Sequence, residues 1–191
     1  MSDTTSPTRE INGVRLPAAG RWRVDPGHAE VGFVGRHFML TKVRGRFTGV
    51  DAVIEIGERP EDSQVKAVID VASLNSGDTT RDDHLRSPDF FDAEKFPKIT
   101  FVSTSVTWDG TGGTLTGDLT IKDVTRPVTL AVEYLGYAHD PWDNHRTVFS
   151  ASGRVNREDW GLTWNMALEA GGVVVSKEIE LVLELEALRE G

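Results

Sequence analysis

The chain contains no cysteine. Disulfide bonds, zinc sites built on thiolates and a lipid anchor on an N-terminal cysteine are therefore excluded. A chain without cysteine suits an oxidising and a reducing compartment equally well, so cysteine usage leaves the compartment open.

Long apolar runs are also missing. Residues 1–20 are polar, include Pro7 and Pro17, and hold no stretch that would serve as a signal peptide. No later run approaches the roughly 20 apolar residues that a membrane-spanning helix needs. We therefore expect no integral membrane segment and, because no signal peptide is visible, a cytoplasmic protein.

Positive charge is in the minority. The 21 Lys and Arg residues face 30 Asp and Glu residues, which gives a net charge of -9 and an isoelectric point near 5.0. Binding to nucleic acid or to an anionic membrane surface draws on clustered Lys and Arg. The overall composition therefore argues against both kinds of partner.

The chain does contain a pattern of period two that begins at Trp22 and continues almost to its end. Alternating apolar and polar residues are typical of antiparallel strands that pack on one face. The last strand shows this most clearly, because its apolar residues alternate with Glu180, Val182, Glu184 and Glu186: Ile179, Leu181, Leu183 and Leu185. Eight or nine such segments, separated by turns such as Asp109–Gly113, predict an all-β fold.

At 191 residues the chain fits a single domain. We expect a flexible N-terminal arm over residues 1–19 and one β-barrel domain over residues 20–191. The segment 73–97 is too long and irregular for a hairpin, so it is expected to hold one or two short helices, around Thr79–Leu85 and Asp89–Ala93.

Several glycines interrupt the strand pattern: Gly35, Gly45, Gly49, Gly117 and Gly153. Glycine within a strand permits tight bending at a barrel corner. Glycine and alanine on the inward-facing positions also leave volume unfilled, which in an eight-stranded barrel favours a cavity over a packed core.

The chemistry-bearing residues give no clear catalytic or metal site. Asp82, Asp83 and His84 resemble a carboxylate–imidazole pair for acid–base chemistry, but no nucleophile accompanies them. These residues, with Arg81 and Arg86, fit a salt-bridged loop clamp equally well. The five histidines show no metal-binding spacing. We therefore predict no catalytic residue, no metal and no cofactor.

A set of motifs occurs in a fixed order along the chain. They are Trp22-x-Val24-Asp25-Pro26-x-His28, Gly45-Arg46-Phe47, Arg81-Asp82-x-His84-Leu85-x-Ser87-x-Asp89-Phe90-Phe91-Asp92, Phe96-Pro97-x-Ile99-x-Phe101, Gly117-Asp118-Leu119-Thr120-Ile121, Thr125-x-Pro127-Val128 and Arg157-x-Asp159-x-Gly161. Over residues 20–188 the chain resembles the YceI-like family of bacterial polyisoprenoid-binding proteins.

The resemblance implies an extended, lipocalin-like antiparallel barrel of eight strands that holds a long isoprenoid or a similar amphiphilic lipid in an apolar pore. Members of the family are often dimeric, so the resemblance implies a homodimer. No catalytic residue is established for the family. Many members carry a signal peptide, and this sequence shows none. Lys122-Asp123-Val124 stands where a glycine is common in the family.

The positions that share the inward-facing side of each predicted strand give candidate ligand-binding residues. Each of these residues could equally be an ordinary core residue of the barrel. The apolar candidates are Phe33, Phe47, Ile69, Phe101, Leu119, Leu130, Phe149 and Leu181. A polar head group is expected at a barrel mouth, where His28, His37 or Arg81 would meet it.

Three functions are consistent with the sequence. The first is non-enzymatic binding, carriage or storage of a long-chain isoprenoid or similar lipid. The second is a small-lipid-processing enzyme that uses His84 with Asp82 or Asp83. The third is a stress-related interaction module whose barrel is filled by side chains.

Overall fold

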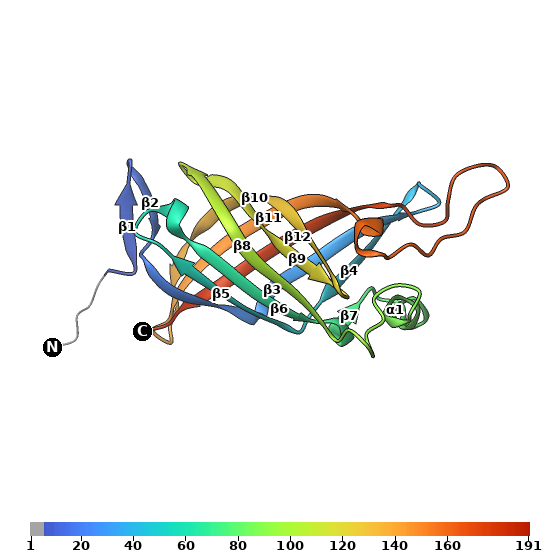
Figure 1. Cartoon of the computed structure of the whole chain (residues 1–191). Helices are drawn as coiled ribbons and strands as arrows, with labels where there is room; N and C mark the ends of the chain where they lie inside the picture. Colours follow the sequence, from blue (N-terminus) through green and yellow to red (C-terminus); the bar gives the residue numbers. More distant parts are fainter. Residues whose placement is uncertain (1–5) are drawn as a thin grey trace.

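The computed structural model describes residues 6–191 and consists mainly of β-strand (Figure 1). The strands are β1 (Thr8–Ile11), β2 (Val14–Pro17), β3 (Gly20–His37), β4 (Thr41–Phe47), β5 (Val50–Ile56), β6 (Gln64–Asp70), β7 (Leu74–Asn75), β8 (Lys98–Asp109), β9 (Gly112–Ile121), β10 (Val124–His139), β11 (His145–Asn156) and β12 (Glu178–Arg189). The helices are α1 (Thr79–Arg86) and three short 3-10 helices, η1 (Pro60–Asp62), η2 (Val71–Ser73) and η3 (Arg157–Trp160).

Eight strands form a closed antiparallel barrel. They follow one another around the wall in the order β12, β11, β10, β9, β8, β6, β5 and β3, and the pairing of β12 with β3 closes the ring. Each neighbouring pair is antiparallel, as the alternating sequence pattern predicted. The expected eight-stranded antiparallel barrel is confirmed.

Strand β3 is long enough to form two parts of the wall. Its first residues pair with β5 and its last seven pair with β4, while β12 follows its other edge. Between these parts, Leu185 faces Ala29 and Ala187 faces Val24, so residues 25–28 of β3 bulge out of the ladder. Asp25-Pro26-Gly27 is a sequence typical of turns, and here it lies in a bulge within one strand.

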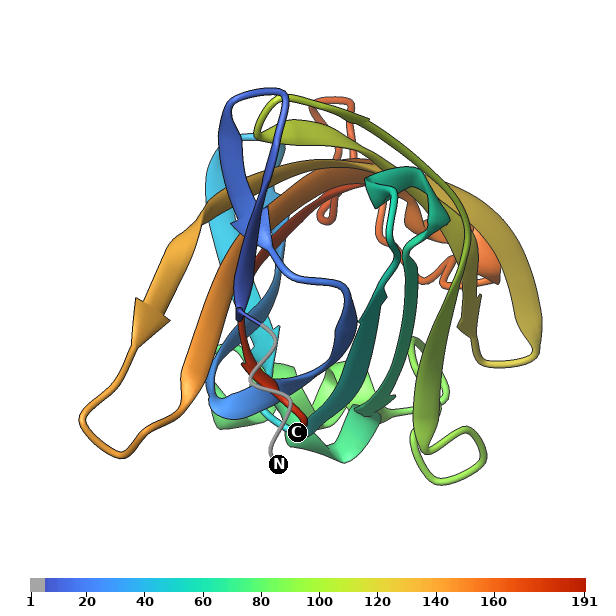
Figure 2. The ribbon, with the colours of Figure 1, turned by 90° about the vertical axis from the view of Figure 1, so that its left-hand side faces the viewer.

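One end of the barrel is closed by packed side chains. Trp22 is fully buried there with Val24 and Ala187, and its indole Nε1 donates a hydrogen bond to the Ala18 carbonyl at 3.2 Å. The β1–β2 hairpin lies across this end, as Figure 2 shows. The sequence predicted a flexible arm over residues 1–19. Residues 8–17 of this segment form the β1–β2 hairpin, in which Leu16 is buried. The part of that prediction that concerns residues 1–5 lies outside the described residues.

The irregular segment 73–97 lies at the opposite end, where Figure 1 shows α1. The Asp78 side chain accepts a hydrogen bond from the Arg81 backbone N–H at 2.8 Å and caps the helix N-terminus. The helix ends before Ser87, which Pro88 follows. The helix expected around Thr79–Leu85 is present, whereas residues 89–93 form turns.

Candidate functional site

The barrel encloses an apolar cavity of about 700 Å³. Inward-facing residues of all eight barrel strands form its wall, among them Ile69 on β6, Leu119 on β9, Leu130 on β10 and Leu181 on β12. A cavity of this size falls within the range of small-molecule sites and is far larger than ordinary packing defects. The interior of the barrel is therefore hollow over part of its length.

Two glycines keep aromatic rings against the cavity wall. A Cβ atom on Gly45 would lie 2.3 Å from Phe33 Cζ, and one on Gly117 would lie 2.3 Å from Phe101 Cζ. The rings thus occupy the space over the glycine backbone of a neighbouring strand. Because the rings lie along the wall, they leave the centre of the barrel free.

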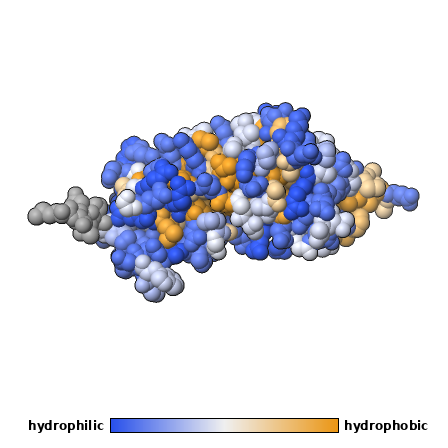
Figure 3. Space-filling view, turned by 90° about the horizontal axis from the view of Figure 1, so that it is seen from below, coloured by the Kyte–Doolittle hydropathy of each residue, from blue (hydrophilic) through white to orange (hydrophobic). Residues whose placement is uncertain are grey.

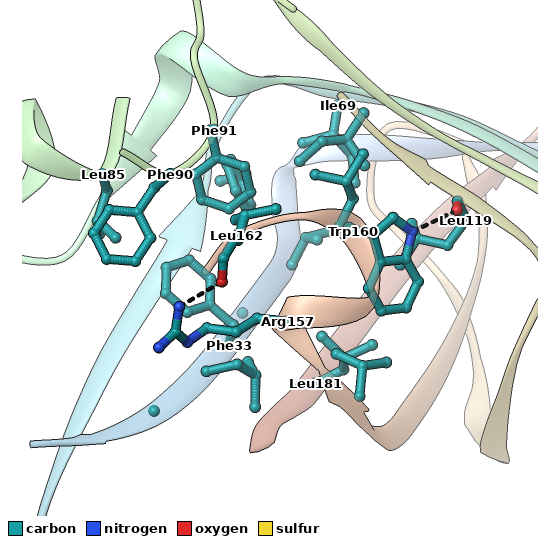
Figure 4. A pocket seen from close by; sticks show the side chains of 18 of the residues that line it. Phe33, Ile69, Leu85, Phe90, Phe91, Leu119, Arg157, Trp160, Leu162 and Leu181 are labelled. Carbon is teal, nitrogen blue, oxygen red and sulfur yellow. Dashed lines mark hydrogen bonds between the residues drawn. The ribbon is translucent and has the colours of Figure 1, made fainter. Parts of the chain in front are cut away.

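The segment after α1 covers part of the cavity. Phe90 is 4% exposed, and Phe91 packs edge-on against Phe47 with ring centroids 5.7 Å apart. Leu85, Phe90 and Phe91 all line the cavity, as Figure 4 shows. This segment therefore forms a side wall from non-strand residues.

The turn at η3 brings a charged side chain into the same wall. Arg157 is 6% exposed, and its guanidinium donates hydrogen bonds to the carbonyls of Ser176 at 2.9 Å, Leu162 at 2.5 Å and Val175 at 3.4 Å. Burial lowers the pKa of the Arg157 guanidinium, and the nearby Glu158 carboxylate partly opposes this. Among the described residues, the hydrogen-bond acceptors of this guanidinium are all backbone carbonyls.

Trp160 follows Arg157 in the same turn and is 2% exposed. Its indole Nε1 donates to the Leu119 carbonyl at 2.9 Å, a bond drawn in Figure 4 together with that of Arg157. Gly161 ends the turn with a φ of 76°, a conformation that favours glycine. The motif thus places one aromatic and one cationic group at the cavity wall.

The exposed residues of the cavity lining gather at the end where α1 lies. They are Arg36, His37, Asp78 and Thr80, and the half-buried Arg81 and His84 lie with them. The cavity therefore opens at the α1 end, and polar groups, most of them cationic or imidazole, surround this mouth. The Arg81 guanidinium donates to the Ser76 hydroxyl at 2.7 Å and to the Ser76 carbonyl at 2.8 Å, which fixes its position.

Most of the predicted ligand-binding residues lie together. Those that line the main cavity are Phe33, His37, Phe47, Ile69, Arg81, Phe101, Leu119, Leu130 and Leu181. Phe149 instead lines a second cavity of about 110 Å³ near the closed end. His28 lies in the bulge of β3, with its side chain 62% exposed, and lines neither cavity.

Sequence reasoning missed several lining residues from irregular segments, notably Leu85, Arg157 and Leu162. A two-residue period carries no information about such segments. The motif Arg157-x-Asp159-x-Gly161 was the available signal. Trp160 and Trp164 line the cavity as well.

The acid–base pair considered for the 82–84 segment is not assembled. Asp82 is buried and accepts hydrogen bonds from the Ser76 N–H and hydroxyl, whereas Asp83 contacts Arg86 at 3.4 Å. His84 Nε2 instead lies 2.8 Å from Asp89 Oδ2, at the cavity mouth. The geometry at Asp82 is that of a structural clamp.

The side chains of Asp25, His28 and Glu186 bring three potential metal ligands within 4.8 Å of one another. The guanidinium of Arg146 already donates to both Asp25 and Glu186, and to Asp140 at 2.7 Å. A hydrogen bond with His28, and then one from Arg146, lower the pKa of Asp25. An arginine therefore supplies the positive charge that these carboxylates face.

Across the described residues, no helix combines the length and apolar character needed to cross a bilayer.

An antiparallel barrel with a large apolar cavity and a polar mouth defines a class of proteins that enclose small hydrophobic molecules. The YceI-like domain family matches residues 22–187, and the chain belongs to this family. The sequence-based resemblance is thereby confirmed.

Related proteins cover most of the chain. A UPF0312 protein of Photorhabdus laumondii is 35% identical over 175 residues, which cover 90% of this chain and 88% of the relative. A UPF0312 protein of Staphylococcus aureus is 37% identical over 165 residues, or 85% of this chain and 94% of the relative.

Solved structures share the fold. The YceI protein of Campylobacter jejuni is 30% identical with a TM-score of 0.70, covering 82% of this chain and 90% of that one. BcnA of Burkholderia cenocepacia is 24% identical with a TM-score of 0.74, and the match covers 85% of this chain and 98% of BcnA. A polyisoprenoid-binding domain from Saccharophagus degradans is 15% identical with a TM-score of 0.62, and the match covers 91% of this chain and 100% of that domain.

Proposed function

We propose that this protein binds a long-chain isoprenoid or a similar amphiphilic lipid in the barrel cavity and carries or stores it without chemical change. The observation that carries the proposal is the cavity of about 700 Å³, apolar along the barrel and polar only at the α1 end. That distribution matches a molecule with a long apolar chain and one polar head.

The apolar chain supplies the binding energy. Each buried CH₂ group contributes about 0.8 kcal/mol, so a chain of several isoprene units needs few polar contacts. Leu119, Leu130 and Leu181 line the part of the wall where such a chain would lie. The flat rings of Phe33 and Phe101 keep this path open.

The head group is placed at the mouth. Arg81 and His37 both line the cavity there, and Arg81 is held by its bonds to Ser76. A phosphate or carboxylate head would accept hydrogen bonds from the guanidinium. The Saccharophagus degradans barrel, which shares the fold, is described as a polyisoprenoid-binding domain, and this agrees with the proposal.

Mass spectrometry of a denaturing organic extract of the purified protein tests this function. The proposal predicts an isoprenoid or another long-chain lipid in stoichiometric amount, and its recovery unchanged after incubation with the delipidated protein. A clean extract that stays clean after incubation with a lipid library would contradict it. Conversion of the added lipid, abolished by His84→Ala, would instead favour an enzyme that uses the His84–Asp89 contact.

A further inference from the structure

The turn between β3 and β4 exposes three large apolar side chains. Phe38, Met39 and Leu40 are 47%, 51% and 79% exposed. The turn is closed by a hydrogen bond from the Leu40 N–H to the His37 carbonyl at 3.0 Å, and Phe38 and Met39 have φ values of 52° and 61°. Two-residue turns with positive φ at both positions favour Asn and Gly. Here two bulky apolar residues occupy them and point into solvent.

A second segment adds to this surface. The loop between η3 and β12 joins the turn through a hydrogen bond from the Phe38 N–H to the Val174 carbonyl at 2.9 Å and a bridge between His37 and Val175. Met166 on this loop is 58% exposed. We call Phe38, Met39, Leu40 and Met166 the apolar tip. Figure 1 shows both segments projecting at the open end of the barrel, and Figure 3 shows apolar surface at that end.

The two strands behind the tip are cationic. Between Glu30 and Asp51 the sequence has no acidic residue and four basic ones: Arg36, Lys42, Arg44 and Arg46. All four are exposed, and Arg36 faces Lys42 directly across the β3–β4 pair. In the described part of the chain none of the four makes an ion pair, although the whole chain has a net charge of -9.

Like charges that face one another across a strand pair repel. A run of cations without acidic partners, next to exposed apolar side chains, therefore calls for an external anionic partner. The nearby acidic groups belong to other segments. Glu169 lies on the loop that carries Met166, and Asp78 and Asp83 lie on the α1 side of the mouth. Glu180 on β12 faces Val34 of β3 and pairs with Arg154. The paired part of the β3–β4 hairpin, residues 31–37 and 41–47, therefore carries basic and no acidic side chains.

We propose that the apolar tip and these four cations dock the open end of the barrel on the surface of an anionic lipid bilayer. The apolar side chains enter the interfacial region, and the cations face the lipid phosphates. The low positive content of the whole chain argued against such adhesion, but its cations are unevenly distributed. His37 lies next to Phe38 and lines the cavity, so docking places the mouth at the membrane. Lipid transfer at that mouth rests on the proposed function, whereas docking does not.

Vesicle flotation tests the docking. The whole protein is mixed with vesicles of phosphatidylcholine alone, or of phosphatidylcholine with phosphatidylglycerol, at low and high salt. We expect binding to the anionic vesicles that is about tenfold or more stronger than to the neutral ones and that weakens as salt rises. Equal binding to both, or none to the anionic vesicles, would overturn the proposal.

Two double variants, each with a matched control, locate the contact. Phe38→Ser with Leu40→Ser removes apolar surface from the tip, and Val68→Ser with Trp142→Ser removes exposed apolar residues elsewhere. Lys42→Glu with Arg44→Glu reverses two hairpin charges, and Lys66→Glu with Arg126→Glu makes the same change in charge elsewhere. Each tip or hairpin variant is expected to lower anionic-vesicle binding about fivefold or more, and each control to leave it unchanged.

Equal effects of variants and controls would contradict a specific docking face. If Phe38→Ser with Leu40→Ser changed the oligomeric state in sedimentation and left vesicle binding intact, the tip would be a protein interface and the proposal would be wrong. Lipid content of the same variants, measured by extraction, separates a failure of docking from a failure of the proposed function.

Discussion

The phenyl ring of Phe33 on β3 lies over Gly45, its direct partner on β4. A Cβ atom at position 45 would lie 2.3 Å from Phe33 Cζ and 2.8 Å from both Cε atoms. No side chain larger than hydrogen fits at position 45 while the ring stays in place. This pair therefore links one glycine in the sequence to the width of the cavity.

Replacing Gly45 with alanine is expected to push the Phe33 ring toward the cavity centre. Overpacking of this kind costs about 1–3 kcal/mol, and the displaced ring takes up volume that a lipid would use. Denaturant unfolding and lipid stoichiometry measure the two effects. Gly27→Ala on β3, the strand that carries Phe33, is the control, because a Cβ atom there would meet only Asp25 Oδ1 at 3.4 Å. Full recovery of stability in Phe33→Leu/Gly45→Ala would support the steric cause, and an unaffected single variant would refute it.

Arg157 is expected to be important for stability. Arg157→Met would leave the carbonyls of Leu162 and Ser176 without their donor. A buried acceptor left unpaired costs about 1–3 kcal/mol, so we expect a loss of roughly 2–5 kcal/mol in the free energy of unfolding, with Arg157→Lys intermediate. Urea titration measures it. A loss below about 1 kcal/mol would show that these bonds contribute little.

The Arg146 cluster makes stability depend on acid pH. Burial would raise the pKa of Asp140, but hydrogen bonds from Asn144 and Arg146 outweigh it and hold this pKa well below its usual range. The pKa of Asp25 is also lowered, by His28 and then by Arg146. A carboxylate whose pKa is lowered by folding contributes stability that is fully present above about pH 4 and is lost as the pH falls through its folded-state pKa.

Arg146→Gln is therefore expected to lower the melting temperature at neutral pH by several degrees. The difference from the unmodified protein should shrink as the pH falls below about 4, because protonation removes the same interactions. Melting curves from pH 2 to 7 measure this, with Arg154→Gln, an exposed arginine on the same strand, as the control. A difference that is constant across this range would contradict the assignment.

Tryptophan fluorescence should report the bound lipid. Trp160 and Trp164 line the cavity, whereas Trp142 is 78% exposed. A brominated long-chain fatty acid, whose bromine quenches indole emission on contact, is expected to quench the unmodified protein and Trp142→Phe alike. Trp164→Phe should lose a large part of the quenching. If Trp142→Phe and Trp164→Phe lost the same share of the quenching, the lipid would lie outside the cavity.

The strand pattern predicted the barrel well, because each inward residue repeats with period two. Ile179, Leu181, Leu183 and Leu185 all line the cavity, as their parity indicated. Parity fixes the face of the sheet on which a residue lies and gives no position along the barrel axis. Phe149 has inward parity and nevertheless lies beside the smaller cavity near the closed end.

Other parts of the site depend on tertiary structure that has no local period. His28 follows the Asp25-Pro26-Gly27 signal, but only the pairing of β3 with β12 shows that these residues bulge outward. Phe90 and Arg157 come from irregular segments far apart in the sequence, and the Arg157 guanidinium lies 5.7 Å from the Phe90 ring centroid. The β1–β2 hairpin was missed because its strands are only four residues long and show no sustained alternation of apolar and polar residues.

The most direct test of the account compares one substitution on two adjacent residues of β6. Ala67 faces the cavity and Val68, 42% exposed, faces solvent. Delipidated Ala67→Phe and Val68→Phe proteins are titrated with the lipid recovered from the unmodified protein, and stoichiometry is read by native mass spectrometry. If the lipid lies in the barrel, Ala67→Phe loses stoichiometric binding while it stays folded, and Val68→Phe keeps it. Undiminished binding by a folded Ala67→Phe protein would contradict a ligand site inside the barrel.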